Sequence, residues 1–225
     1  MPWGTGEDVT GEDVERFKQG VRRSPYRIAR LKLSGGEPTL HRGLQEICRS
    51  LVELRQERLL ESVVVVTNGS TRGPDLPLGC RYRRTGTEKA HHEPHLVSPH
   101  DMFVRGELQV CGIQKTCGVC FDKPGWTFCG LAWQFGQILS IDVHSEDITV
   151  ERDGRICQHC IWSLPSPVRD AVHWCVYTGI VSYPTPTFAA ALGVPSQEIS
   201  VPELWGRHHQ ILTRAGRRGV SQREH

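Results

Sequence analysis

Nine cysteines are the residues of this sequence whose type and spacing best suit chemistry, and six of them fall between positions 111 and 160. Two pairs within that stretch have Cys-x2-Cys spacing, and another cysteine lies between the pairs. Two thiolates on one tight turn can reach the same metal ion, and thiolates from a second segment can complete a tetrahedral set. The sequence therefore predicts a metal site whose four best ligands are Cys117, Cys129, Cys157 and Cys160. Two further cysteines rank next as ligands, namely Cys120 and Cys111.

The spacing of these cysteines does not choose the metal, because thiolate sulfur binds both zinc and iron–sulfur clusters. The N-terminus lacks the basic and apolar regions of a signal peptide, so clustered cysteines indicate metal ligands or redox groups rather than disulfides. The alternative is that some of them are buried structural thiols, which pack like small hydrophobic side chains. That interpretation suits Cys48 and Cys175, but it fits poorly for two Cys-x2-Cys pairs.

A second candidate site is the segment 34–41, which reads Ser-Gly-Gly-Glu-Pro-Thr-Leu-His. Gly35 and Gly36 have no Cβ, so the backbone there can approach a ligand closely. The carboxylate of Glu37 is a natural partner for an ammonium group. The alternative interpretation is a tight strand-to-helix turn in which Glu37 is only a carboxylate at the start of a helix.

A few regular elements must position these residues. Hydrophobic periodicity predicts a helix over 10–23, capped by Thr10, and a second helix over 44–58. Short strands are predicted over 28–33 and 62–66. The second strand is apolar at every position after its first, as expected for a parallel strand covered on both faces. The order helix, strand, helix, strand predicts a parallel unit of the α/β class.

The strand, the Ser-Gly-Gly-Glu-Pro-Thr-Leu-His segment, the helix and the Val-rich strand ending in Thr-Asn-Gly together resemble the radical S-adenosylmethionine (radical SAM) family over residues 10–70. The resemblance implies a (β/α) barrel, here a partial barrel fragment, with its cofactors at the carboxyl ends of the strands. It also implies that Gly35, Gly36 and Glu37 hold the amino group of S-adenosylmethionine, and that Asn68 contacts the ribose.

The same resemblance implies a Cys-x3-Cys-x2-Cys loop upstream of the Gly-Gly-Glu segment, whose thiolates hold a catalytic 4Fe–4S cluster. The sequence has no cysteine before Cys48. We therefore expect that loop to lie upstream of Met1, in an N-terminally shortened copy rather than in a degenerate relative. The chain as written lacks the ligands of the catalytic cluster, so its status as an enzyme stays open. We also expect the chain alone to bind S-adenosylmethionine weakly or not at all.

The later cysteines resemble the auxiliary-cluster region, of the SPASM or twitch type, that follows the barrel in some radical SAM enzymes. This resemblance favours a 4Fe–4S cluster, with zinc as the alternative. The runner-up function is a non-catalytic zinc- or iron–sulfur-binding module in which the α/β unit is only a scaffold. The expected organisation is a partial radical SAM domain over 1–70, a linker or long loop over 71–110, a loop-rich, Cys-rich metal-binding region over 111–175, and a Pro-rich, basic tail over 176–225.

Composition narrows the class of partner. The 225 residues include 27 Lys+Arg and 25 Asp+Glu, a net charge of 27 − 25 = +2, which is not the basic excess of a typical nucleic-acid binder. The longest apolar runs, 63–66 and 188–194, are too short to cross a bilayer. We therefore expect a cytoplasmic protein that binds small-molecule cofactors, with neither nucleic acid nor membrane as a partner. The sequence does not indicate the substrate.

Overall fold

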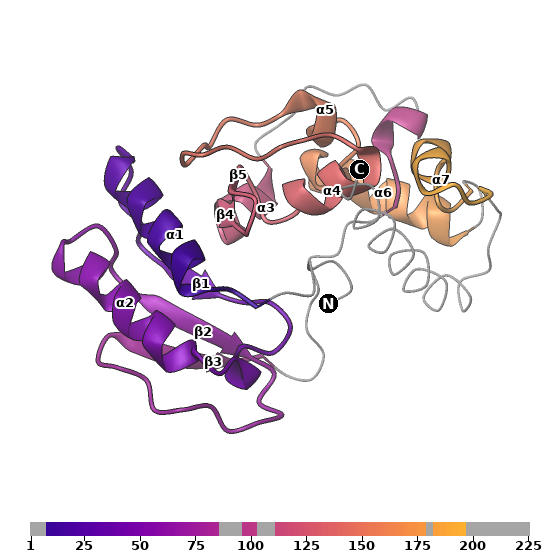
Figure 1. Cartoon of the computed structure of the whole chain (residues 1–225). Helices are drawn as coiled ribbons and strands as arrows, with labels where there is room; N and C mark the ends of the chain where they lie inside the picture. The colour runs from indigo at the N-terminus through magenta and orange to yellow at the C-terminus, as the bar shows by residue number, and fades with distance from the viewer. Residues whose placement is uncertain (1–7, 86–95, 103–110, 179–181, 197–225) are drawn as a thin grey trace.

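The structure, a computed structural model, describes residues 8–85, 96–102, 111–178 and 182–196 (Figure 1). The first of these ranges forms a small parallel sheet with two helices, and the later ranges form a mainly helical region. The predicted mixture of helices with a small parallel sheet is therefore confirmed. Within the described residues, no helix is both long enough and apolar enough to cross a membrane.

Helix α1 (Gly11–Arg23) begins at Thr10, as the sequence predicts. The Thr10 hydroxyl accepts a hydrogen bond from the Asp13 N–H at 3.2 Å, and the Asp13 carboxylate accepts one from the Thr10 N–H at 2.9 Å. This reciprocal arrangement is a capping box, which satisfies two donors that would otherwise be unpaired. The apolar face of the helix is buried, and its members are Val14, Phe17 and Val21.

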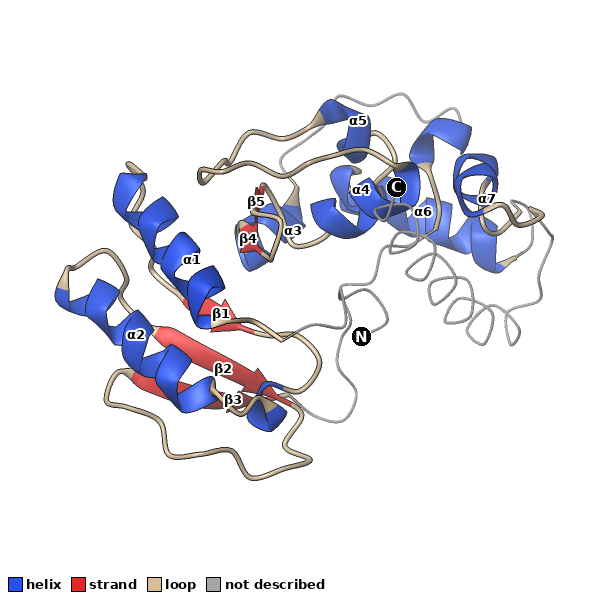
Figure 2. Cartoon of the chain, viewed as in Figure 1, coloured by secondary structure: helices blue, strands red, loops and turns tan. Residues whose placement is uncertain are grey.

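Three parallel strands form the sheet in the order β1 (Leu31–Leu33), β2 (Val63–Thr67) and β3 (Cys80–Arg84). Helix α2 (Leu44–Gln56) connects β1 to β2, and α1 and α2 cover the same face of the sheet (Figure 2). The three valines at 63–65 are at most 2% exposed. Successive side chains of a strand point to opposite faces, so β2 is buried on both faces at these positions, as its uninterrupted apolar run predicts.

Strand β3 lies within 71–110, where the sequence indicates a linker or long loop. It pairs in parallel with β2, and Cys80 lies opposite Val63 in the register. Cys80 and Tyr82 pack against the hydrophobic cluster beneath α2, whereas the arginines that alternate with them are exposed. This alternation of period two is the signature of an edge strand, and the density of arginine obscures it in the sequence. The segment is therefore partly regular, which differs from the expected linker.

The second region is built from short elements. Its helices are α3 (Gly112–Cys117), α4 (Ala132–Leu139), α5 (Gly154–Cys157), α6 (Ser166–Tyr177) and α7 (Pro186–Leu192). Its only described strands form an antiparallel hairpin, β4 (Cys120–Phe121) with β5 (Trp126–Thr127). Three 3₁₀ turns complete the described elements of the chain, namely η1 (Pro38–Leu40), η2 (Pro99–Met102) and η3 (Ile161–Ser163).

Helix α7 falls in the stretch 176–225 that the sequence indicates as a tail. Phe188 of this helix is fully buried, and its ring centroid lies 5.6 Å from that of Phe135 in α4. The first part of the expected tail is therefore part of the core of the second region. Residues 197–225 lie outside the described residues.

An aromatic cluster joins α1 to the β4–β5 hairpin. The ring centroids of Phe17 and Trp126 are 5.1 Å apart, and Phe121 packs edge-on against both rings. Arg16 donates a hydrogen bond to the backbone carbonyl of Lys123 at the tip of the hairpin. Aromatic pairs in this geometry add to the gain from burial alone, so this cluster helps to hold α1 against the hairpin.

We predict that Gly20→Ala destabilises the protein, although alanine is ordinarily the better helix former. A Cβ atom at Gly20 would lie 2.5 Å from Nε1 of Trp126, so the ring or the helix must shift. The expected loss is about 1–3 kcal/mol in the free energy of unfolding, measured by urea denaturation. Gly11→Ala is the matched control, because no atom lies within 4 Å of its Cβ position. Equal stability of the two variants would contradict the packing described above.

Candidate functional site

The carboxylate of Glu37 lies at the carboxyl edge of the sheet, between the end of β1 and the start of η1. Its Oε1 accepts hydrogen bonds from the hydroxyls of Thr67, at 2.6 Å, and Thr39, at 2.7 Å, and from the Thr39 N–H at 3.2 Å. Its Oε2 accepts one bond from the Asn68 N–H, at 2.9 Å. Glu37 therefore ties the turn after β1 to the end of β2.

These donors determine the charge state of Glu37. Partial burial acts to raise the pKa of this carboxyl, but the hydrogen bonds from Thr67, Thr39 and Asn68 outweigh burial and lower the pKa to about 2. Glu37 is thus ionised at any physiological pH. A carboxylate oxygen can accept more than one hydrogen bond, so Oε2 retains capacity for a further donor. That oxygen is the part of Glu37 suited to an ammonium group.

The geometry around Glu37 supports part of each interpretation of the Gly-Gly-Glu segment, the structural turn and the ligand site. Glu37 caps the η1 turn, as the structural interpretation predicts. Around Gly35 and Gly36, however, no atom lies within 4 Å of a Cβ position, and neither residue has a left-handed φ. Among the described residues, neither a close contact at the Cβ position nor a left-handed backbone therefore explains the two glycines. Asn68 follows β2, and its side-chain oxygen accepts a bond from the Ser70 N–H at 2.7 Å.

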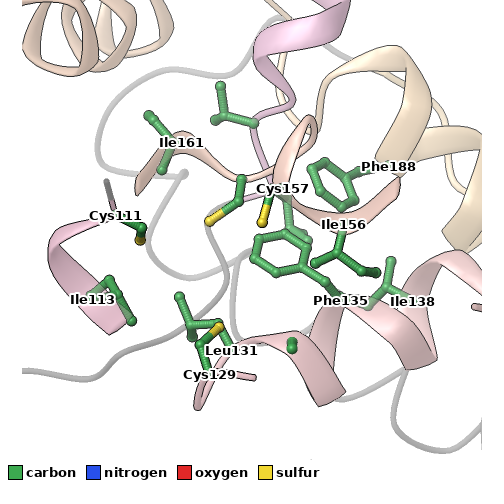
Figure 3. Packing of buried hydrophobic residues seen from close by; sticks show 14 of the residues in the cluster. Cys111, Ile113, Cys129, Leu131, Phe135, Ile138, Ile156, Cys157, Ile161 and Phe188 are labelled. Carbon is green, nitrogen blue, oxygen red and sulfur yellow. The ribbon is translucent and has the colours of Figure 1, made fainter. Parts of the chain in front are cut away.

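The second candidate site is a cavity of about 20 Å³ in the core of the second region. Its lining includes four cysteines that are each no more than 8% exposed: Cys111, Cys129, Cys157 and Cys160. Figure 3 shows the labelled members of this set around the same space, beside Leu131 and Phe135. We call these four residues the thiol cluster. They come from three separate segments of the chain, so it is the fold that brings them together.

Local structure fixes the turn that carries two of these thiols. Asp153 caps α5 by accepting a bond from the Arg155 N–H at 2.8 Å, and Cys157 lies at the end of that helix. The hydroxyl oxygen of Ser163 then lies 2.7 Å from the backbone carbonyl of Cys157 and 2.6 Å from that of Cys160, so its single hydrogen is shared between the two carbonyls. The Cys-x2-Cys turn is therefore held from both ends, with its two side chains facing the cavity.

The electrostatics of the cavity favour neutral thiols in the absence of a cation. Burial raises the pKa of Cys129 to about 11 and that of Cys157 to about 12, and it raises the pKa of Cys160 well above its usual value. Arg152 also lines the cavity, and its positive charge acts in the opposite direction on Cys157. Any metal bound here must therefore displace protons from the thiols.

The structure separates the six predicted ligands into two groups. Cys111 belongs to the thiol cluster, although the sequence ranks it below the four best ligands. Cys117, at the end of α3, and Cys120, on β4, do not line the cavity, but both interact electrostatically with Cys129. Burial raises the pKa of Cys120 to about 12. Cys117 and Cys120 thus lie beside the thiol cluster, on the hairpin side.

The side chains of the thiol cluster lie too far apart, as they stand, to coordinate one metal ion. Within the described part of the chain, no three His, Cys, Asp or Glu side chains are grouped closely enough to hold a metal ion. The donor chemistry nevertheless fits, because four thiols converge on one cavity whose other walls are mainly apolar. The volume is sufficient for a single ion or water molecule. A bound metal would have to draw the sulfur atoms inward.

Sequence reasoning missed three polar residues at this cavity. Arg152, Gln114 and Ser163 all contribute to its lining. Gln114 donates to the carbonyl of Val150 at 2.7 Å and so fixes the wall near Arg152. No signal in the sequence marks Arg152 or Gln114. The position of Ser163, three residues after the second Cys-x2-Cys pair, is the one local feature that would have indicated a supporting role.

We predict that Glu37→Gln lowers the free energy of unfolding by about 1–3 kcal/mol near pH 7, because the amide cannot accept all the donors that the carboxylate accepts. The folded pKa lies below the usual value of 4.5, so the stabilisation exists above the unfolded pKa and disappears as pH falls toward about 2. Urea denaturation at neutral and acidic pH should therefore show that the two proteins converge in acid. Glu46→Gln, an exposed position on α2, is the control. A constant difference across the acidic range would contradict the assigned pKa.

Comparison of the chain with protein-family models, with curated proteins and with solved structures finds no match.

Proposed function

We propose that this chain carries a thiolate-bound metal centre in its second region and belongs to a protein of the radical SAM type. One observation carries the proposal: four cysteines from three distant segments line a single buried cavity. Burial of one free cysteine is unremarkable, since its side chain behaves as a small hydrophobic group. Convergence of four on one cavity, with two of them from a Cys-x2-Cys turn, is what a tetrahedral thiolate site requires.

The thiol cluster would supply the ligands of this centre. Cys157 and Cys160 would bind from the turn that Ser163 supports, while Cys111 and Cys129 would bind from the opposite walls. Bound thiolates carry negative charge, which Arg152 is placed to offset. The apolar walls keep water from the sulfur atoms. An iron–sulfur cluster would supply electron transfer at this position, and zinc would supply structural stability.

Two properties support different metals. The resemblance to the auxiliary-cluster region favours a 4Fe–4S cluster. The cavity of about 20 Å³ instead has room for one ion, so an iron–sulfur cluster requires its lining to move apart. This volume favours the second candidate function, a non-catalytic zinc-binding module. The identity of the bound metal separates the two proposals.

The first region would contribute part of a site for S-adenosylmethionine. Its three parallel strands place Glu37 and Asn68 at the same carboxyl edge, the edge at which ligands of parallel α/β proteins bind. The free capacity of Oε2 suits the amino group of the cofactor, and the open space that the described residues leave at Gly35 and Gly36 suits its close approach. In this proposal the sheet is a fragment of a (β/α) barrel.

The metal proposal predicts that the chain, purified without oxygen, holds roughly one metal centre, since thiolate sites of this kind bind with about 10 kcal/mol or more. Cys157→Ala/Cys160→Ala should abolish loading, measured as metal and sulfide per chain. Cys48→Ala is the control, because this buried thiol belongs to α2 in the first region, outside the thiol cluster. Brown protein with equal iron and sulfide supports the cluster, and colourless protein with zinc supports the module. Full occupancy in the double variant would refute the ligand assignment.

A second pair of variants tests whether the ligands are the cysteines that line the cavity or those that the spacing in the sequence ranks highest. Cys111→Ser should reduce metal loading more than Cys117→Ser, because Cys111 lines the cavity and Cys117 does not. Zinc loading should also weaken steadily as pH falls below the raised pKa values of Cys129, about 11, and Cys157, about 12, because the ligands must lose their protons. The pH dependence is measured by titration with zinc, with proton release recorded in parallel. A Cys117→Ser variant that loses its metal while Cys111→Ser retains it would favour the ranking from the sequence.

A further inference from the structure

A separate cavity of about 340 Å³ lies between the loop 68–79 and strand β3. This volume is in the range of about 300–1,000 Å³ that small-molecule sites occupy. Three arginines belong to its lining, namely Arg72 in the loop and Arg81 and Arg84 on the strand. Leu76 and Cys80 provide an apolar portion. The cavity therefore combines a cationic rim with an apolar wall.

The loop that encloses this cavity is fixed by specific contacts. The Tyr82 hydroxyl donates to the carbonyl of Pro74 at 2.8 Å, and the side-chain amide of Gln45 in α2 donates to the carbonyl of Asp75 at 3.0 Å. Gly73 permits the close approach, because a Cβ there would lie 2.1 Å from the Tyr82 hydroxyl oxygen. The cavity is thus a built feature of the fold rather than a gap beside a free loop.

The charge of the lining is strongly positive. Its three guanidinium groups face a single lining carboxylate, that of Asp75, which gives 3 − 1 = +2. No hydrogen bond or ion pair joins Arg72, Arg81 or Arg84 to another side chain within the described residues. Arg84 lies alongside Gly69, where a Cβ would meet its Cδ at 3.4 Å, so its side chain is directed along the loop. These arginines are available to a ligand.

The remaining polar groups narrow the chemistry of that ligand. The lining hydroxyls offer no hydrogen to an anion. Those of Thr39 and Thr67 donate to Glu37, that of Thr71 then donates to Thr39, and that of Tyr82 donates to Pro74. The arginines are therefore the principal donors. A phosphate monoester carries a charge of about −1.5 to −2 near neutral pH, which matches a lining of +2. Guanidinium groups also match the geometry of phosphate oxygens with paired hydrogen bonds.

We infer that this cavity binds a small organic phosphate monoester, with the phosphate held by Arg72 and Arg84 and the organic part against Leu76. This site is distinct from the proposed S-adenosylmethionine site. Glu37 attracts a cation, whereas this cavity attracts an anion, and Thr39 and Thr67 stand between them.

Arginines on an edge strand have another common role, which is to prevent pairing with other chains. That role accounts for Arg81 and the neighbouring exposed Arg83. It does not account for Arg72, which lies on the facing loop. It also does not explain why hydrogen bonds hold that loop beside the cavity. The ligand site explains these further features together.

Calorimetric titration of the full chain tests the inference with two probes, adenosine 5′-monophosphate and glucose 6-phosphate, and with adenosine as the uncharged reference. Hydrogen bonds to charged groups contribute about 1.5–3 kcal/mol each, so at least one phosphate should bind about tenfold more tightly than adenosine. Binding of both probes identifies the phosphate as the main determinant. Binding of one alone identifies which organic part the apolar wall accepts.

Three variants complete the test. Arg72→Gln/Arg84→Gln should weaken phosphate binding about tenfold or more. Asp75→Asn should strengthen binding because it removes the only carboxylate of the lining, and a gain cannot result from misfolding. Arg49→Gln, an exposed position on α2 outside the cavity, should leave binding unchanged. The inference is overturned if neither phosphate binds, if adenosine binds as tightly as its phosphate, or if the double variant binds like the parent chain.

Discussion

The burial of four thiols in one cavity is the constraint on which the second region depends. Its longest helix, α6, has only 12 residues, and its two described strands have two residues each. Elements so short have little intrinsic stability, and they must be held by what they enclose. The thiol cluster lies among the most buried side chains of this region, including Phe135, Ile156 and Ile161. A bound metal would join segments that are otherwise held by apolar contacts and by a few hydrogen bonds, such as those that Gln114 donates to the carbonyls of Phe128 and Val150.

The first region is held together by regular elements and hydrogen bonds rather than by a cluster of thiols. Its elements follow from a capped amphipathic helix, a valine-rich central strand and the ionised carboxylate of Glu37 at the sheet edge. Hydrogen bonds within the region itself hold these features together, over short separations at Thr10 and over 30 positions of the chain at Glu37. The aromatic contact of Phe17 with Trp126 connects it to the hairpin next to the thiol cluster.

Sequence reasoning succeeded where a feature is local. Thr10 and the spacing of apolar residues predict α1, and the run of valines predicts β2, because capping and burial act within a few residues. The Cys-x2-Cys spacing likewise predicts the turn from Cys157 to Cys160. Strand β3 was not predicted, since its alternation is masked by arginine. The place of Cys111 in the cavity was not predicted either, because it depends on contacts between distant segments.

X-ray absorption spectroscopy of the anaerobically purified chain, at the edge of whichever metal it holds, tests the central claim most directly. The thiol cluster predicts a first shell made of sulfur alone, with about four thiolate or sulfide ligands at ~2.3 Å, and no nitrogen or oxygen neighbour. Iron as a second scatterer would indicate a cluster, and its absence would indicate a mononuclear site. A first shell of nitrogen and oxygen would contradict the account, as would a chain that contains no metal after anaerobic purification.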